Sequence, residues 1–464
     1  MSYIDAITNL NALTAELFSA PGVPRRKFSL NEIGILCAAL GNPHLQYPSV
    51  LIAGTNGKGS TASTLASIAR ESGLRVGLYT SPHLDRVNER IRLLLPQKAA
   101  DDSTIPNETF GRLYFRVHDA ARQLVADGKL PAFPSYFELL TALGFLYFAE
   151  SKIDLAVLEV GMGGRLDATN LVDPILSVIT DISLDHQEWL GSTIAEIARE
   201  KAGILRANGT LITLPQHPEA NQALGEVAVA LNVRGIPATE YMPIMSTDPL
   251  LPYQIEALGR IIQVDSPLKG AHQHRNLALA IATAVELSES GRFPITPEAI
   301  EKGIHNTSWP GRIEQISLPN QPEFLLDVAH NPAGAWALRS ALSASAVEGQ
   351  PQILIFACLR DKPLREMTQI LFPLFDHVVL APIHSPRATD VADLTAAAEA
   401  TGIPAHPSQT VAEALQIATE IARSLLQPNH PPARIVVSGS VYLVGEARHL
   451  LLAKTASESR PGAH

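Results

Sequence analysis

One glycine-rich heptapeptide constrains the fold of this chain more than any other feature. The residues Gly-Thr-Asn-Gly-Lys-Gly-Ser at 54–60 lie between a short apolar run at 50–53 and a segment of helical spacing at 60–72, and a second apolar run follows at 76–79. A strand, a glycine loop, a helix and another strand form a βαβ unit, which requires a parallel sheet covered by helices. The sequence therefore predicts an α/β fold built around this loop.

The same loop has the composition of a phosphate cradle. Glycines let backbone N–H groups converge on an anion, the helix N-terminus adds partial positive charge, and Lys58 can neutralise β- and γ-phosphate oxygens. The loop departs from the usual P-loop because Ile52 replaces the first glycine and Gly59 stands where Ser or Thr normally holds Mg²⁺. A metal-binding hydroxyl must then come from elsewhere. The residues expected to bind ATP are Thr55, Asn56, Gly57, Lys58, Gly59 and Ser60. The alternative is a plain turn between strand and helix.

The pattern along the rest of the chain predicts two α/β domains. Helices are expected at 2–18, 29–40, 272–289 and 296–304, and further strands at 155–160, 175–180 and 211–214. A small antiparallel insertion is expected within 238–268. Turn formers at 306–311 predict a linker, after which strands are expected at 323–328, 352–357, 376–380 and 434–438. We therefore expect a P-loop ATPase-like domain with a mostly parallel sheet at 1–308, a smaller Rossmann-like domain at 309–455, and a disordered tail at 456–464.

Composition and charge exclude several classes of protein. A length of 464 residues with 46% hydrophobic and 18% charged residues indicates a folded globular chain, and no apolar run is long enough to span a bilayer. A net charge of −10 argues against a nucleic-acid partner. The two cysteines, Cys37 and Cys358, lie in apolar runs and are expected to be reduced core thiols. No export signal precedes the first helix, so we expect a cytoplasmic protein.

Three further residues lie where a chemical role and an ordinary structural role must be weighed. Glu159 ends an apolar strand, so its carboxylate is expected at the ligand-binding edge of the sheet, where it can hold Mg²⁺; the alternative is an exposed strand end. Lys201 precedes the helix-ending Gly203, and these residues alone favour a cation that interacts with the helix macrodipole. Asn331 before Pro332 is typical of a helix N-cap.

The chain resembles the folylpolyglutamate synthase/dihydrofolate synthase family of the Mur ligase superfamily over about residues 28–450. The glycine loop carries this resemblance together with ordered blocks at 79–84 (YTSPHL), 88–91 (NERI), 137–138 (FE), 158–170 (LEVGMGGRLDATN), 184–186 (LDH), 200–203 (EKAG), 272–273 (HQ), 309–312 (WPGR) and 327–332 (DVAHNP).

The resemblance implies roles for residues of each block. It places one Mg²⁺ on Ser81 and Glu159 and a second on His186, and it leaves room for a monovalent cation. Lys201 would be carbamylated and orient the metal, Asp327 would fix the ribose of ATP, and His330 would lie near the reacting phosphate. Asn276 and Arg312 would complete the ATP contacts. Residues implied to face the pterin or glutamate substrate are Ser135, Tyr136, Phe137, Glu138, Leu166, Asp167, Ala168 and Ser440.

Ordinary interpretations remain for several of these residues. Ser81 can be a turn residue before Pro82, His186 a partner of Asp185, Arg312 a surface arginine and Phe137 a core residue. Asp167 is the most informative substrate candidate, because a carboxylate can accept hydrogen bonds from pterin N–H groups.

The activity implied by the resemblance is that of an ATP-dependent ligase. It would join L-glutamate to dihydropteroate and to tetrahydrofolate (poly)glutamates through an acyl phosphate, with residues 309–455 as the glutamate-ligase domain. We expect a monomer that acts on small molecules. The alternatives are a folylpolyglutamate synthase without dihydrofolate synthase activity, another Mur-type amino-acid ligase, and a P-loop ATPase that regulates a partner.

Overall fold

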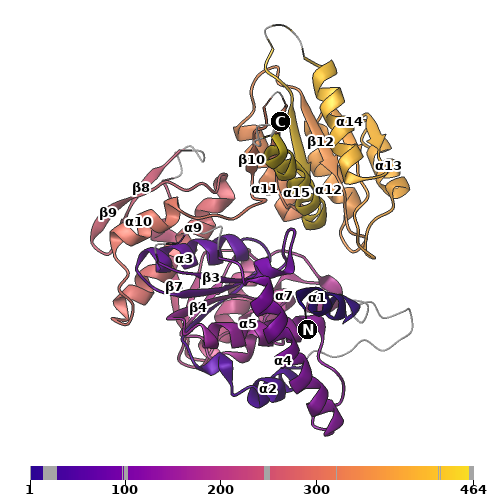
Figure 1. Cartoon of the computed structure of the whole chain (residues 1–464). Helices are drawn as coiled ribbons and strands as arrows, with labels where there is room; N and C mark the ends of the chain where they lie inside the picture. Colours follow the sequence, from indigo (N-terminus) through magenta and orange to yellow (C-terminus); the bar gives the residue numbers. More distant parts are fainter. Residues whose placement is uncertain are drawn as a thin grey trace, which may run out of the picture.

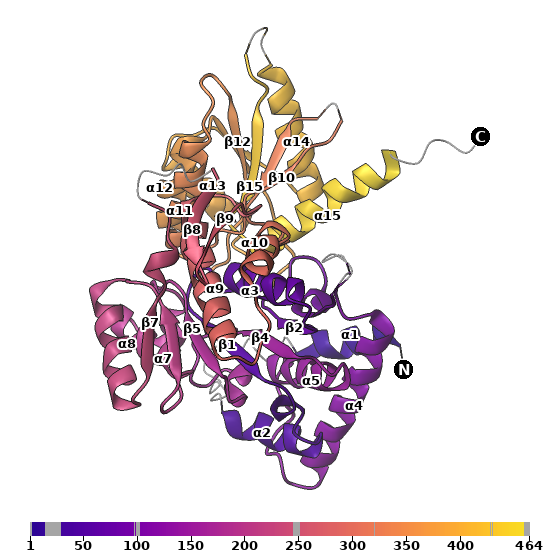
Figure 2. The same ribbon diagram turned by 90° about the vertical axis from the view of Figure 1, so that its left-hand side faces the viewer.

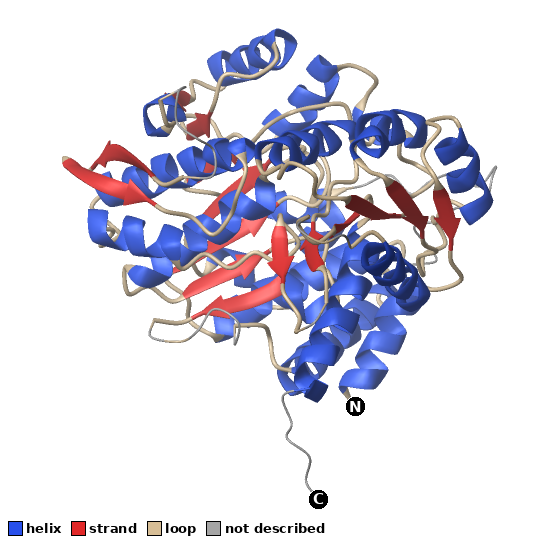
Figure 3. Cartoon of the chain, turned by 90° about the horizontal axis from the view of Figure 1, so that it is seen from above, coloured by secondary structure: helices blue, strands red, loops and turns tan. Residues whose placement is uncertain are grey.

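The computed structural model of the chain describes residues 2–13, 29–96, 98, 103–244, 251–319, 321–426, 428 and 430–458. Apart from one short hairpin, the described strands form two sheets, and helices cover both of them (Figures 1 and 3). The first sheet comes from the N-terminal part of the chain, and the second, with its helices, lies above it in Figure 1. The α/β prediction is confirmed. The boundary at 308/309 stays a prediction.

The first sheet has the strand order β3-β2-β4-β1-β5-β6-β7, and only the pair β2 and β3 is antiparallel. Its strands are β1 (Ser49–Ala53), β2 (Val76–Tyr79), β3 (Ile91–Leu94), β4 (Leu155–Glu159), β5 (Leu176–Ile179), β6 (Thr210–Thr213) and β7 (Arg234–Pro237). The central β1 lies between β4 and β5. Because parallel strands end at the same edge of a sheet, the loops after β1, β4 and β5 meet there.

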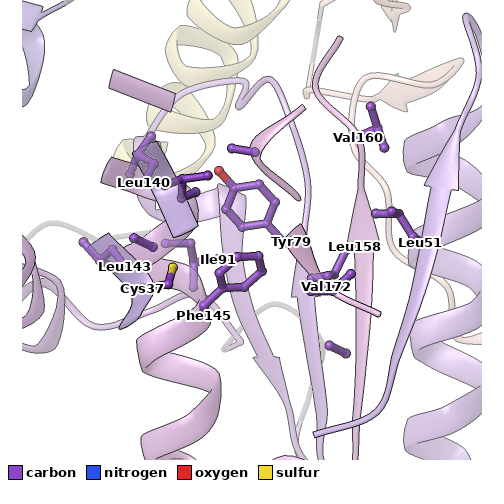
Figure 4. Close-up of a cluster of buried hydrophobic side chains, with 14 of the residues drawn as sticks. Cys37, Leu51, Tyr79, Ile91, Leu140, Leu143, Phe145, Leu158, Val160 and Val172 are labelled. Carbon is purple, nitrogen blue, oxygen red and sulfur yellow. The ribbon is translucent and has the colours of Figure 1, made fainter. Parts of the chain in front are cut away.

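Strand β1 is buried on both faces, and its alternate side chains enter different cores. Val50 and Ile52 pack with α3, α9 and α10, whereas Leu51 and Ala53 face α2, α4 and α5. Figure 4 shows part of the cluster that contains Leu51, with Tyr79 among apolar side chains such as Phe145 and Leu140. The helices of this part are α1 (Tyr3–Ala12), α2 (Leu30–Ala39), α3 (Lys58–Glu71), α4 (Asn107–Ala126), α5 (Tyr136–Glu150), α6 (Gln187–Leu190), α7 (Ile194–Ala202), α8 (Pro218–Ala230), α9 (Ala271–Glu289) and α10 (Pro297–His305). Continuous apolar runs are what such doubly covered strands require.

The second sheet has the order β10-β11-β15-β12-β13-β14, with only β10 and β11 antiparallel. Its strands are β10 (Glu314–Ile316), β11 (Glu323–Leu326), β12 (Gln352–Phe356), β13 (His377–Leu380), β14 (Ala405–Pro407) and β15 (Arg434–Ser438). Its helices are α11 (Pro332–Ala344), α12 (Leu364–Leu371), α13 (Val391–Glu399), α14 (Val411–Ser424) and α15 (Val441–Glu458) (Figure 2). The predicted antiparallel insertion is confirmed as a hairpin of β8 (Tyr253–Ala257) and β9 (Arg260–Val264).

The four strands that the sequence did not predict in these two sheets are their edge strands β3, β7, β10 and β14. Each has only three or four residues. Strands β7, β10 and β14 are partly exposed and carry Gly235, Glu314 or His406 where a buried strand would continue its apolar run, whereas β3 is mostly buried and its apolar run is interrupted by Arg92. Edge strands need only one partner and often expose one side, so their composition resembles that of a loop.

The ends of the chain differ from expectation in one respect. Helix α15 continues to Glu458, so the predicted disorder from 456 is wrong for residues 456–458. Ala456 and Glu458 are good helix formers, and extending an existing helix requires no new nucleation. Residues 459–464 and residues 14–18 of the first predicted helix lie outside the described residues.

Two smaller findings concern the cysteines and membranes. Cys37 and Cys358 are both free and buried, as predicted. Among the described residues, no helix combines the length and the apolar character that a membrane crossing requires.

Candidate active site

The glycine loop after β1 is shaped by other segments that approach its backbone closely. Gly54 has a φ angle of 151°, and a Cβ atom there would lie 1.8 Å from Thr180 Oγ1. Gly57 caps α3 with a φ angle of 88°, and a Cβ atom there would lie 2.1 Å from Asn276 Oδ1. Both positions therefore require glycine for steric as well as conformational reasons.

Gly59, the second departure from the usual P-loop, has a packing explanation. A Cβ atom at Gly59 would lie 2.6 Å from Cζ2 of Trp309, so the indole ring fills the space where a Ser or Thr side chain would stand. The indole Nε1 is buried without a hydrogen-bond partner among the described residues. The metal-binding hydroxyl of the usual P-loop is thus replaced by an aromatic side chain from the predicted linker.

Two lysines meet at the glycine loop. Lys58 Nζ donates hydrogen bonds to the carbonyl oxygens of Gly54 at 3.1 Å and Thr55 at 3.0 Å, and Lys201 Nζ donates to Gly54 O at 2.7 Å. Lys201 lies in the last turn of α7, as the helix-end interpretation expects, but its side chain is only 3% exposed. Burial lowers the pKa of Lys201 to about 7, and Lys58 acts in the same direction. A substantial share of the Lys201 amine is therefore neutral near neutral pH.

Glu159 and Ser81 are brought together at the carboxyl edge of the first sheet. Glu159 is 4% exposed, and its Oε2 accepts a hydrogen bond from Ser81 N at 3.1 Å. Burial raises the pKa of Glu159, whereas the nearby cations Lys58 and Arg312 oppose that rise. The alternative of an exposed strand end is therefore wrong.

A carboxylate and a hydroxyl are hard oxygen donors of the kind that Mg²⁺ prefers. The described residues contain no group of three or more His, Cys, Asp or Glu side chains with metal-binding geometry. This arrangement fits Mg²⁺ shared with phosphate oxygens and water, which is how proteins commonly hold this ion.

His186 lies in the loop after β5, in a left-handed conformation with a φ angle of 51°. Burial lowers the pKa of His186 to about 4, so its imidazole is neutral and able to ligate a metal. Its neighbour Asp185 accepts the His186 backbone N–H at 2.9 Å. Burial alone would raise the pKa of the Asp185 carboxyl, but His186 and Lys362 hold it below its usual value. His186 Nε2 lies 3.9 Å from Asp185 Oδ2, so the alternative role as a partner of Asp185 and the metal role both stay open.

A cavity of about 400 Å³ brings together residues of both parts of the chain. Its lining includes the predicted ATP residues Asn56, Gly57, Ser60, Asn276, Arg312 and Asp327, together with the predicted catalytic residue His330. The predicted ATP residues Thr55, Lys58 and Gly59 do not line it. A second cavity of about 260 Å³ contains Ser81, Glu159 and Trp309, and Arg312 lines both cavities. Arg312 therefore lies between the predicted nucleotide site and the predicted metal residues, and the surface-arginine interpretation is wrong.

Asp327 and His330, two residues of the larger cavity that come from the C-terminal part of the chain, are oriented by hydrogen bonds to nearby backbone groups. Asp327 accepts hydrogen bonds from Ile313 N at 3.1 Å and Ala329 N at 3.0 Å. His330 Nδ1 lies 2.8 Å from Val328 O, which assigns the proton to Nδ1 and leaves a lone pair on Nε2. Burial lowers the pKa of His330 to about 4, so this neutral tautomer persists at neutral pH.

Several of the residues predicted to bind the pterin or glutamate substrate are engaged in contacts within the protein. Ser135 and Glu138 form a reciprocal capping box at the start of α5. The Phe137 ring packs edge-on against Tyr79, with 6.1 Å between ring centroids. Ser440 Oγ accepts a hydrogen bond from Tyr442 N at 3.2 Å. All eight predicted residues are described, and none lines either cavity. Their substrate roles, including those of Tyr136, Leu166 and Ala168, stay predictions.

Asp167 has a structural role that its sequence context did not indicate. Its Oδ1 accepts hydrogen bonds from Thr169 N at 3.0 Å and Thr169 Oγ1 at 2.5 Å, and its Oδ2 accepts from Met162 N at 2.9 Å. It is 7% exposed. The carboxylate thus caps the short helix at Ala168–Leu171 and ties down the glycine-rich loop after β4. A hydrogen bond from a pterin N–H group would therefore have to use a lone pair of the Asp167 carboxylate that these three bonds do not occupy.

The sequence analysis missed Lys362 and gave no role to Gln273, which it quoted only within the block at 272–273. Lys362 follows β12 and forms an ion pair with Asp185 at 2.6 Å, and Gln273 accepts a hydrogen bond from Asn276 at 2.8 Å. The position of Lys362 just beyond a buried strand, at the carboxyl edge of the second sheet, is a signal that could have found it. Asn331 caps α11 as predicted and also contacts Asn56, a contact that no local pattern could indicate.

Comparison with protein families identifies the class of protein. Residues 133–284 match the Mur ligase middle domain, and residues 311–441 match the Mur ligase glutamate ligase domain. The fold is thus that of an ATP-dependent ligase of the Mur type.

Comparison with individual proteins shows to which family of the Mur ligase superfamily the chain belongs. The chain is 35% identical over 427 residues to the folylpolyglutamate synthase of Lacticaseibacillus casei, covering 90% of this chain and 93% of that protein. It is 33% identical over 389 residues to the dihydrofolate synthase/folylpolyglutamate synthase of Bacillus subtilis, covering 80% and 85%. A structure of the Mycobacterium tuberculosis folylpolyglutamate synthase with ADP and AMPPCP superposes with a TM-score of 0.85 at 31% identity, covering 99% of this chain and 100% of that one. Escherichia coli FolC in complex with DHPP and ADP gives 0.79 at 28%, covering 97% and 98%. The chain belongs to the folylpolyglutamate synthase/dihydrofolate synthase family of the Mur ligase superfamily.

Proposed function

We propose that this protein uses ATP to join the amine of L-glutamate to a carboxylate of dihydropteroate and of tetrahydrofolate (poly)glutamates, releasing ADP and phosphate. The observation that carries the proposal is the larger cavity, in which the glycine loop after β1 faces Arg312, Asp327 and His330 of the C-terminal part. The names of the similar proteins supply the substrate class.

The first step makes the carboxylate reactive. A carboxylate oxygen attacks the γ-phosphorus of ATP, the bond from that phosphorus to the β,γ-bridging oxygen breaks, and ADP leaves. The product is an acyl phosphate. Lys58 and Arg312 would offset the charge on the transferred phosphoryl group, which is the main contribution a protein makes to this reaction.

The second step forms the amide bond. The glutamate amine attacks the acyl carbon, and the tetrahedral intermediate expels phosphate while the nitrogen loses a proton. The free lone pair on His330 Nε2 makes this residue the candidate acceptor of that proton. Enclosure of the site between the two parts of the chain would keep water from hydrolysing the acyl phosphate first.

The residues predicted to bind metal would support the same reaction. Ser81 and Glu159 would hold one Mg²⁺, and His186 would hold a second, oriented by carbamylated Lys201. Bound there, Mg²⁺ supplies neutralisation of phosphate charge. The neutral share of the Lys201 amine supports carbamylation, because only the unprotonated amine reacts with CO₂. A monovalent cation, a monomeric state and a cytoplasmic location stay predictions.

The decisive measurement is ADP release with pure protein. We expect release to require both L-glutamate and a pteroyl carboxylate, and dihydropteroate, ATP and glutamate together should yield dihydrofolate. Lys58→Ala should abolish turnover, whereas Lys129→Ala, which removes an exposed surface lysine, should not. An equal rate of ATP hydrolysis in the absence of L-glutamate and of the pteroyl carboxylate would favour the alternative, a P-loop ATPase that regulates a partner. Folate extension without dihydrofolate formation would restrict the activity to a folylpolyglutamate synthase.

A further inference from the structure

The two parts of the chain are joined beside the site by a buried ion pair. Lys362 Nζ, in the loop after β12, lies 2.6 Å from Asp185 Oδ1, in the loop after β5. Their side chains are 4% and 10% exposed. Exposed ion pairs contribute little, but a buried pair depends strongly on having both partners in place.

A second set of contacts converges on the same carboxylate. Asn331 Nδ2, at the start of α11, donates to Asp185 Oδ2 at 3.3 Å and to Asn56 Oδ1 at 3.0 Å. Asn56 Nδ2 returns a hydrogen bond to Asn331 Oδ1 at 3.3 Å. Asp185 thus receives donors from two separate loops of the second sheet, and one of those donors also holds the phosphate loop. We call the four residues Asp185, Lys362, Asn331 and Asn56 the Asp185 clamp.

The clamp acts on His186 through the backbone. The same Asp185 Oδ1 that binds Lys362 accepts the backbone N–H of His186 at 2.9 Å. His186 has a φ angle of 51°, a left-handed conformation that is uncommon for residues other than glycine. Fixing Asp185 therefore fixes the backbone from which the imidazole of His186 projects.

We propose that Lys362 is a positioning residue that makes the geometry of His186 depend on docking of the C-terminal part onto the N-terminal part. When the two parts are docked, Lys362 and Asn331 hold Asp185, and Asp185 holds His186. When they separate, Asp185 loses both donors and His186 loses its support. This inference deepens the proposed function and rests on it, because it assigns to docking the assembly of the site in which the acyl phosphate would form.

The test uses Lys362→Met in the full-length protein. With ATP, L-glutamate and the pteroyl carboxylate at saturation, we expect kcat to fall about 10- to 100-fold, which is the size of a typical coupling between sites. The KM for ATP should change little. Hydrogen exchange of the segment 182–190, followed by mass spectrometry with a non-hydrolysable ATP analogue bound, should become faster. Lys362→Arg, which keeps the charge, should restore part of both readouts.

Arg360→Met is the matched control. Arg360 lies two residues away in the same loop, and its side chain is 60% exposed and pairs with the exposed Asp390. This variant should change neither readout. Unchanged exchange in Lys362→Met, whatever its activity, would overturn the proposal. If the wild type shows no glutamate-dependent ADP release, the proposed function fails, and the exchange experiment still decides whether Lys362 orders the segment.

Discussion

Burial makes Lys201 a titrating group near neutral pH. Its pKa in the folded protein is about 7, below the usual 10.5 that the unfolded chain retains. Between these values the unfolded chain binds a proton that the folded chain does not, so folding becomes more favourable as the pH rises. Below about pH 7 both states are protonated and the cost of burying the charge is constant.

We therefore predict that the free energy of unfolding of the wild type rises, relative to that of Lys201→Met, from about pH 7 toward about pH 10, by at most about 1.4 kcal/mol per pH unit. Urea unfolding of both proteins across this range measures the difference, with CO₂ excluded because carbamylation would consume the neutral amine. Parallel stability curves would contradict it. With labelled bicarbonate added, the wild type should show a carbamate signal that Lys201→Met lacks.

The N-terminus of α5 combines a structural and a predicted substrate role. Ser135 Oγ accepts the Glu138 N–H at 3.3 Å and donates to Glu138 Oε2 at 2.7 Å, so the pair is a reciprocal cap. Loss of such a cap typically costs about 1 kcal/mol of stability. We expect Ser135→Ala to lower the free energy of unfolding by about this amount, measured by urea unfolding.

A conservative variant separates the two roles of Ser135. Asparagine also caps helices well but has no hydroxyl, so Ser135→Asn should keep most of the stability. If its KM for dihydropteroate is also unchanged, the hydroxyl acts only as a cap. A raised KM at unchanged stability would support a direct contact with the substrate.

Docking of the two parts of the molecule requires close packing at Gly445. Gly445 lies on α15, and a Cβ atom there would stand 2.0 Å from the carbonyl oxygen of Leu84 in the N-terminal part. The neighbouring His449 Nδ1 lies 3.1 Å from Asp85 Oδ2 in the same contact. A methyl group at position 445 would act as a wedge beside the smaller cavity, which Leu84 lines.

We predict that Gly445→Ala loosens this contact and lowers kcat/KM about 5- to 150-fold, the equivalent of about 1–3 kcal/mol of overpacking. Small-angle scattering of the nucleotide-bound protein should show a larger radius of gyration than the wild type. Gly225→Ala on α8 is the control, because nothing lies within 4 Å of a Cβ atom there. Wild-type scattering and activity in Gly445→Ala would contradict the prediction.

Local sequence determined the central framework of this protein. The strand, glycine loop and helix around Lys58 and the buried strands of both sheets follow from short apolar runs and turn formers, because a doubly covered strand must be apolar and a tight loop must contain glycine. The edge strands could not be predicted in this way. The resemblance of the motif blocks supplied the candidate site residues, many of which line the larger cavity.

Tertiary structure alone decided what those residues do. The sequence pattern of α7 could not determine whether the Lys201 side chain faces solvent or the site. In the folded chain Lys201 contacts Gly54 and is buried. In the sequence Gly59 is only a departure from the usual P-loop, whereas in the structure Trp309 occupies the space that a side chain at this position would need. Lys362 and Asp185 are 177 residues apart in sequence and 2.6 Å apart in space. Local preferences extend over a few neighbouring residues, whereas burial, charge pairing and steric contact depend on segments that meet only when the whole chain folds.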